Sequence, residues 1–363
     1  MTSIIKFPLH LKALPRGLSK VSLGAIALAL SLTSCTTNQQ TINPVNSPIT
    51  SPTTNASSPS ANLPKVVVTH SVLCDITKEI AQATIDLQCL IAAGSDPHEY
   101  QAKPEDKRAI EQAKLILYGG YNFEPALIKM IQSSQTPATK VAVSEVAVPK
   151  PLKGEEDHDH GKDQAGKPEG QAKDHDHGEF DPHIWQNAQY GAQMVQVVRD
   201  KLKTLSPENT SLYTNNAEKL TKNLQEIDTW IKTQVKTIPA EQKQLITTHE
   251  SMSYFADAYG IKLEGALQGL TTEEQPTATR IAELVQKIKS TKVPTIFPEA
   301  NINPGLMKVV AKEANIKVAE NPIFGDGLGE KGSLGDTYVK MLTSNTCTIV
   351  NGLGGKCIPF VAK

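Results

Sequence analysis

The chain has 363 residues, of which 37 are Lys or Arg and 38 are Asp or Glu, with a formal net charge of −1 and 39% hydrophobic residues. This length corresponds to about two domains, and the apolar content, once the 23 glycines are added, is that of a folded protein. The balanced charge argues against a general nucleic-acid binder, and five cysteines are too few for a small disulfide-rich scaffold.

Residues 1–34 are predicted to be the signal peptide of a lipoprotein. They contain four basic residues, no acidic residue and a short apolar stretch at 21–32, the pattern of an export signal. This stretch is shorter than the ~20 residues that a helix needs to cross a membrane. It ends in Leu-Thr-Ser-Cys, which resembles a bacterial lipobox, so we expect cleavage before Cys35 and lipid on its sulfur. The alternative is an ordinary signal peptide with an incidental cysteine.

Residues 35–64 are predicted to be the lipidated cysteine followed by a flexible tether. The segment 36–64 carries no charge and consists mostly of Thr, Ser, Asn, Gln and Pro. Such a segment buries too little apolar surface to offset the entropy lost on ordering. It would hold a folded body away from a membrane surface.

Residues 65–205 are predicted to form an N-terminal α/β lobe. Short β-branched runs alternate with amphipathic stretches, which indicates a parallel sheet flanked by helices. The expected strands are 65–69, 87–92, 115–118 and 140–143, and the expected helices are 75–83, 104–112, 124–133 and 188–205.

A histidine-rich acidic insert at 153–180 interrupts this lobe. It holds nine acidic residues, four lysines and four histidines, and no core-facing period can be written across it, so we predict an exposed loop. Two Asp-His-Asp-His repeats place imidazole beside carboxylate, which suits weak capture of several divalent ions. The alternative is a plain solvated acidic insert. The candidate auxiliary ligands are His158, His160, His175 and His177.

Residues 206–237 are predicted to form a linking helix, and 238–363 a second α/β lobe. A helix of about 30 residues spans roughly 45 Å, which is longer than one small lobe. The expected strands of the second lobe are 244–247, 263–267, 294–297 and 317–319, and its expected helices are 252–259, 277–289, 304–314 and 336–343. The predicted fold class is therefore α/β, with two lobes of parallel β-sheet flanked by helices and joined by one long rigid helix.

Histidines outside the leader and the insert mark the expected chemistry. His98 and His183 each end an Asp-Pro-His tripeptide, in which proline restrains the backbone and the preceding Asp is a candidate outer acceptor. His249 ends a strand-like segment, at the sheet edge where α/β folds place ligands. His70 and Glu299 also follow strands and are possible supporting residues; a structural histidine and a solvent-facing Glu are the alternatives.

Four segments of the chain resemble a known family. They are SDPHEYQAKPED, FDPHIWQN, THESMSYFADAYG and IFGDGLGEKGSLGDTYVKML. They resemble the zinc/manganese solute-binding proteins of bacterial ABC transporters (the ZnuA/TroA-like, cluster A-I group). The resemblance, from residue 65 to about 342, implies a metal site in the interlobe cleft, with His98 and His183 from one lobe and His249 and Asp326 from the other. The acidic insert lies where zinc-type members commonly carry one.

The fourth site departs from the family pattern. Many relatives read Thr-Asp-Ser-Leu there, whereas this chain has glycines on both sides of Asp326. Because glycine is conformationally permissive, we expect these glycines to loosen the loop.

The expected transported ligand is Zn²⁺. Three imidazoles and one carboxylate suit zinc, whereas manganese favours more oxygen donors. Manganese members of the resembling family usually carry Glu where this chain has His249. Mn²⁺ or another divalent metal is the alternative. Because the imidazoles bind metal when neutral, affinity should fall as pH drops through about 6.5.

Four cysteines remain after Cys35, and three pairings of them are possible. Short loops favour Cys74–Cys89 and Cys347–Cys357, and buried free thiols are the alternative.

The resemblance implies a periplasmic or extracellular, lipid-anchored component that delivers zinc to a membrane permease, and we expect a monomer that is not an enzyme. A zinc hydrolase is disfavoured because catalytic zinc keeps a position open for water and the chain lacks an HExxH motif. A metal-dependent adhesin on the same fold is a second alternative.

Overall fold

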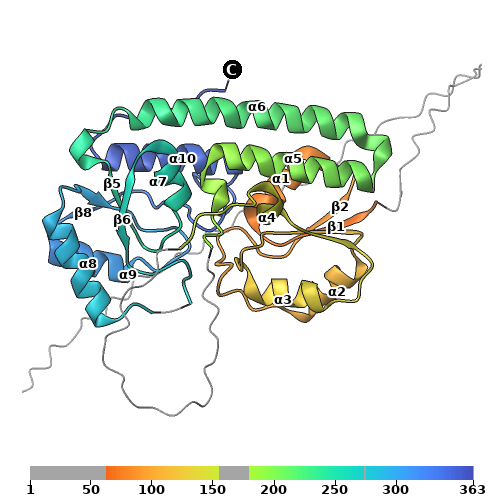
Figure 1. The fold of residues 1–363 in the computed structure, drawn as a ribbon, viewed down its shortest axis with the longest axis horizontal. Coiled ribbons are helices and arrows are strands. Elements are labelled where there is room, and N and C mark those ends of the chain that lie inside the picture. The colour runs from red at the N-terminus through yellow and green to blue at the C-terminus, as the bar shows by residue number, and fades with distance from the viewer. Residues whose placement is uncertain (1–62, 155–179, 274, 363) are drawn as a thin grey trace, which may run out of the picture. The chain divides into compact units, whose positions relative to one another are not determined.

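The computed structural model describes residues 63–154, 180–273 and 275–362, all within one unit that spans 60–363 (Figure 1). The predicted signal peptide, Cys35, most of the tether and the four histidines of the acidic insert lie outside the described residues.

Four parallel strands in the order β2-β1-β3-β4 form the sheet of the first lobe. The strands are β1 (Lys65–Val68), β2 (Asp86–Cys89), β3 (Leu115–Tyr118) and β4 (Thr139–Ala142). The helices of this lobe are α1 (Ser71–Ala81), α2 (Pro104–Gln112), α3 (Pro125–Ser133), α4 (Val143–Ala147) and α5 (Ala188–Leu205).

Helices cover both faces of this sheet because its two central strands, β1 and β3, are apolar on both sides. Val66 and Val68 join the core cluster that contains residues of α1 and α5, whereas Val67 packs with Ile110 of α2 and Ile131 of α3. Figure 1 shows α2 and α3 on one side of the sheet and α1 and α5 on the other. Buried parallel strands of this kind are typical of α/β folds.

The long helix α6 (Thr210–Val235) follows a short 3₁₀ turn at Pro207–Asn209 and contacts both halves of the unit (Figure 1). It packs on α1 and α5 of the first lobe and on α7 and α10 of the second. Its buried positions include Leu224, Ile227 and Ile231, at the three- and four-residue steps of one helix face.

The second lobe contains two parallel strand pairs, β5 (Gln244–Thr247) with β6 (Lys262–Ala266) and β7 (Thr295–Ile296) with β8 (Lys317–Val318). A parallel bridge between Thr247 and Phe297 places the pairs in the order β6-β5-β7-β8. The helices are α7 (Ser253–Tyr259), α8 (Ala278–Ser290), α9 (Gly305–Ala314) and α10 (Tyr338–Gly352), with a 3₁₀ turn at Ala240–Gln242 (η3). Another 3₁₀ turn, η1 (Ile184–Gln186), precedes α5 in the first lobe. The predicted fold class, with parallel sheets flanked by helices and one long helix, is confirmed.

The largest differences from the sequence-based expectation concern three helices. Helix α1 begins at Ser71, four residues before the expected start at 75, because Val72 and Leu73 already pack in the core. The short helix α4 was not predicted. Helix α10 continues to Gly352 instead of ending at 343, since the polar residues Asn345 and Thr346 are buried on it and hide its apolar period.

Two disulfides are present, Cys74–Cys89 and Cys347–Cys357, with Cα–Cα distances of 5.9 and 5.1 Å. The first joins α1 to β2, and the second joins α10 to the C-terminal segment. They are the two pairings that short loops favour. Within the residues that the structure describes, no helix is long and apolar enough to span a membrane.

Candidate metal centre

Three histidines and one aspartate that lie far apart in the chain converge at one point. One ligand atom from each of His98, His183, His249 and Asp326 lies within 4.8 Å of the others. The Asp326 Oδ1 atom is the centre of the group, at 3.0 Å from Nε2 of His183, 2.9 Å from Nε2 of His249 and 3.5 Å from Nε2 of His98. The four residues are at most 3% exposed.

Loops and turns position these side chains, and those that carry His98 and His249 follow the carboxyl ends of β2 and β5. His98 lies between β2 and α2, His183 directly precedes η1, His249 follows β5, and Asp326 lies between β8 and α10. Parallel strands end at the same sheet edge, so segments remote in sequence meet there.

Carboxylates orient two of the imidazoles. Asp181 Oδ1 lies 2.7 Å from Nδ1 of His183 and also accepts a 2.8 Å hydrogen bond from the His183 backbone N–H. Glu299 stands in a similar place beside His249: Oε2 makes a 2.7 Å ion-pair contact with Nδ1 without hydrogen-bond geometry, and Oε1 accepts from the His249 backbone N–H at 2.9 Å. A carboxylate at Nδ1 leaves Nε2 to face a metal, as is usual for metal-binding histidine.

His98 is held differently from the other two histidines. Its backbone N–H donates to Asp96 Oδ1 at 2.9 Å, and Asp96 Oδ2 accepts from the Thr272 hydroxyl at 2.6 Å. Among the described residues, Nδ1 of His98 has no hydrogen-bond partner. The ring packs instead against Phe123, with the centroids 5.1 Å apart.

The charges of the centre favour a bound cation. Burial lowers the pKa of His183, but the carboxylates of Asp181 and Asp326 outweigh burial and raise this pKa to about 9. Burial also lowers the pKa of His249, but the carboxylates of Asp326 and Glu299 outweigh burial and raise this pKa well above its usual value. For Asp326, burial would raise the pKa, but His249 and the other histidines hold it well below its usual range. Without metal, protons on the imidazoles thus balance the buried carboxylate, and a cation can replace them.

The loop that carries Asp326 is packed closely rather than loosened by its glycines. The Gly325 carbonyl oxygen accepts from the Trp185 indole at 3.0 Å and from the Gln186 amide at 2.7 Å. A Cβ at Gly325 would stand 2.2 Å from Glu299 Oε2, and one at Gly327 would stand 2.6 Å from the Ser71 hydroxyl. The glycines therefore permit close approach, and the expectation of a loose loop is wrong.

His70 and Glu299 occupy different places relative to the centre. Glu299 is buried and contacts His249, as described above. His70 is buried between Phe123 and Trp185, with each ring centroid 5.2 Å away, and neither of its nitrogens has a hydrogen-bond partner in the described part of the chain. Burial lowers the pKa of His70 to about 3. Among the described residues, His70 is therefore held by ring packing and not by hydrogen bonds.

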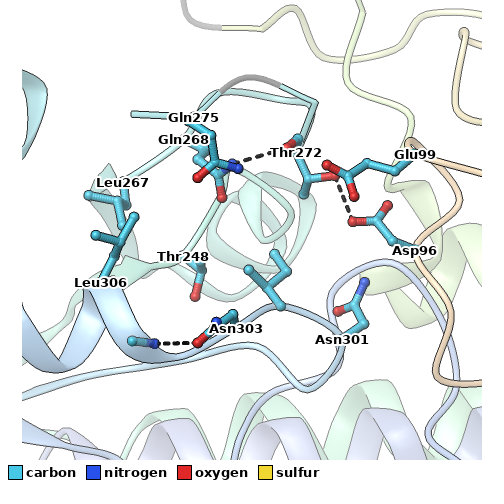
Figure 2. A pocket seen from close by; sticks show the side chains of 12 residues that line it. Asp96, Glu99, Thr248, Leu267, Gln268, Thr272, Gln275, Asn301, Asn303 and Leu306 are labelled. Carbon is cyan, nitrogen blue, oxygen red and sulfur yellow. Dashed lines mark hydrogen bonds between the residues drawn. The ribbon is translucent and has the colours of Figure 1, made fainter. Parts of the chain in front are cut away.

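A cavity of about 460 Å³ lies beside the centre, between the segment around Asp96 and the second lobe (Figure 2). Its lining includes Glu99, Thr248, Thr272 and Asn301. Asn301 also donates a 3.0 Å hydrogen bond to Asp326 Oδ2. Sequence reasoning missed Asn301 and Thr272, and no motif marks either of them.

The donor set fits a divalent ion such as zinc. Three imidazole nitrogens and one carboxylate oxygen are four ligands of the kind found in tetrahedral zinc sites. The packing of the Asp326 loop and the carboxylates beside His183 and His249 hold the ligands near their binding positions. Small shifts of these side chains would therefore enclose an ion. Four protein ligands leave no position for the water of a hydrolase.

Known proteins resemble this chain over most of its length. The model of the family "Zinc-uptake complex component A periplasmic" matches residues 66–352. The metal ABC transporter substrate-binding lipoprotein SsaB of Streptococcus sanguinis is 35% identical over 305 residues, which cover 82% of this chain and 92% of SsaB. The manganese ABC transporter substrate-binding lipoprotein PsaA of Streptococcus mitis is 34% identical, over 80% of this chain and 89% of PsaA.

The fold also matches solved structures. The periplasmic zinc-binding protein TroA of Treponema pallidum superposes with a TM-score of 0.70 and 29% sequence identity, covering 80% of this chain and 99% of TroA.

Proposed function

This chain belongs to the family of periplasmic metal-binding components of ABC transporters, and on that premise we propose that it binds Zn²⁺ and delivers it to a membrane permease. The family comprises substrate-binding proteins and not enzymes. The ion would be held by His98 and His183 of the N-terminal lobe (65–205) and by His249 and Asp326 of the C-terminal lobe (238–363), with 206–237 linking the lobes.

One observation carries the choice of zinc. The Nε2 atoms of three histidines converge on a single carboxylate oxygen, Asp326 Oδ1. A set of three nitrogens and one oxygen is a zinc-like set, whereas manganese favours sites richer in oxygen. Manganese is the second candidate because relatives such as PsaA are named for it.

The test is the metal content of the purified full-length protein. We expect one tightly bound Zn²⁺ per chain, retained when Mn²⁺ is offered at equal concentration. His249→Ala should lose this ion, because it removes one of four ligands. A parent protein that retains manganese and rejects zinc would overturn the zinc proposal.

A matched control replaces the four histidines of the acidic insert, His158, His160, His175 and His177, by alanine. We propose that they capture ions weakly, so this variant should keep the single tight site and lose only weaker binding. Loss of the tight site in this variant would contradict the division of roles.

We further propose that the protein acts as a monomer, exported and anchored to the cell envelope by lipid on Cys35. Relatives such as SsaB are named as lipoproteins, which supports the anchor. A Cys35→Ser variant should fail to incorporate labelled fatty acid and should leave the membrane fraction. Fatty-acid labelling that persists in this variant would refute the assignment.

A further inference from the structure

We propose that Asn301 determines metal selectivity by restricting Asp326 to one ligand oxygen; this inference rests on the function proposed above. The two oxygens of Asp326 have different neighbours. Oδ1 faces the three histidine Nε2 atoms, and Oδ2 accepts the 3.0 Å hydrogen bond from the Asn301 side-chain amide. Among the described residues, Asn301 is the one hydrogen-bond donor to Oδ2.

The backbone holds Asn301 in place for this contact. The preceding residue, Ala300, donates its N–H to the Ile323 carbonyl oxygen at 2.9 Å, and the Ile323 N–H donates to the Pro298 carbonyl oxygen at 2.9 Å. The segment that carries Asn301 is thus paired with the segment that leads into Asp326. The amide reaches Oδ2 from a fixed position and not from a free loop.

The consequence is a difference in coordination number. With Oδ2 hydrogen-bonded to Asn301, Asp326 offers one oxygen, and the site has three nitrogens and one oxygen, which suits tetrahedral zinc. If Oδ2 were released, the carboxylate would offer two oxygens, and manganese prefers such oxygen-rich, higher-coordinate sites. Asn301 also lines the 460 Å³ cavity (Figure 2). Shortening this side chain would therefore admit water, a further oxygen ligand.

Two variants test the role of Asn301. Asn301→Ala removes the amide, and Asn301→Asp keeps the shape but replaces the donor by an acceptor. The matched control is Asn303→Ala, in the same cavity wall. The Asn303 side chain accepts from the Gly305 backbone N–H, and within the described residues no hydrogen bond joins it to Asp326. Thermal unfolding identifies any variant that does not fold. If one of the two variants at position 301 fails to fold, the other still tests the role of Asn301.

The measurements are the ratio of Zn²⁺ to Mn²⁺ affinity, from competition with a chromophoric chelator, and the visible spectrum of the Co²⁺ form. Both variants at position 301 should shift the ratio toward manganese by about tenfold, the lower end of what one hydrogen bond to a charged group contributes. Their Co²⁺ bands should weaken from the intense four-coordinate spectrum expected of the parent. Asn303→Ala should match the parent in both measurements.

Variants that keep the ratio of the parent, or that shift it with an unchanged four-coordinate Co²⁺ spectrum, would overturn the inference. The affinity ratio of the parent protein tests the proposed function, that is, whether the protein prefers zinc. The difference between parent and variants decides the role of Asn301. The acidic insert is the same in all of them, so its contribution cancels.

Discussion

The indole nitrogen of Trp185 donates a 3.0 Å hydrogen bond to the carbonyl oxygen of Gly325, although 140 residues separate them. The Gln186 side-chain amide donates to the same oxygen at 2.7 Å and to the Phe324 carbonyl oxygen at 2.8 Å. The turn that follows His183 is therefore hydrogen-bonded to the loop that carries Asp326. In chain order Asp326 belongs to the second lobe, but these contacts hold it to the first.

Replacing Gln186 by leucine should weaken metal binding as well as stability. The substitution removes one of the two donors to each of two buried carbonyl oxygens, since Trp185 still donates to Gly325 and Asn345 to Phe324. The lost hydrogen bonds cost about 0.5–1.5 kcal/mol each, and the Asp326 loop becomes freer to move. We expect the zinc affinity to fall at least ~10-fold by chelator competition.

The control is Gln196→Leu on α5. The Gln196 side chain donates to the Thr221 hydroxyl of α6 and not to the loop that carries Asp326. It should lower the unfolding temperature slightly and leave the zinc affinity unchanged. Equal affinity losses in the two variants would show that the hydrogen bonds from Gln186 to the Asp326 loop have no specific role in metal binding.

Asp181→Asn tests the orientation of His183. It keeps the size of the side chain but removes the charge beside Nδ1, and loss of such a supporting carboxylate typically lowers metal affinity by about 10–100-fold. Asp96→Asn is the comparison, because Asp96 contacts the backbone of His98 and the Thr272 hydroxyl. Isothermal titration should show the larger loss for Asp181→Asn, and the reverse order would contradict the proposed geometry.

Metal binding should release protons even at pH values well above the pKa of a free imidazole. In the metal-free protein the pKa of His183 is raised to about 9, so at pH 7 zinc must displace its proton. The apparent affinity should therefore keep rising with pH between about 7 and 9, by up to tenfold per pH unit for each proton displaced. Titrations in buffers of different ionisation enthalpy measure the proton count; an affinity that levels off above pH 6.5 would contradict this result.

His70 should destabilise the protein in acid. Burial lowers its pKa from 6.5 to about 3, so between these values the unfolded chain binds the additional proton. Stability contributed by neutral His70 is then complete above pH 6.5 and is lost as pH falls, with a slope of up to about 1.4 kcal/mol per pH unit. Denaturant unfolding of metal-free His70→Leu between pH 6.5 and 4 should show a shallower loss than the parent.

A parallel pH series on His70→Gln separates this effect from packing, because glutamine is polar but does not titrate. Both variants should lose the same part of the slope, whatever their stability at pH 7. A slope equal to that of the parent in both would mean that His70 takes up its proton over the same pH range in the folded and unfolded states, and would contradict this prediction.

Much of the fold was predictable because its signals are local. Val66, Val67 and Val68 form a β-branched run that is apolar on both faces, and the period of buried residues in α6 marks a long helix. Boundaries were less predictable where polar residues are buried. Asn345 lies on α10 and bonds the Phe324 backbone, so its polarity gave no sign that the helix continues.

For the candidate site, the sequence by itself determined the type of residues available, since the Asp-Pro-His tripeptides and the resemblance to a transporter family indicated His98, His183, His249 and Asp326. Only the tertiary structure decided how these side chains are oriented. Glu299 stands 2.7 Å from the His249 ring, and Asn301 holds one oxygen of Asp326. Such contacts join segments from different strands, and their distances depend on the packing of the whole unit, which no local pattern of residues encodes.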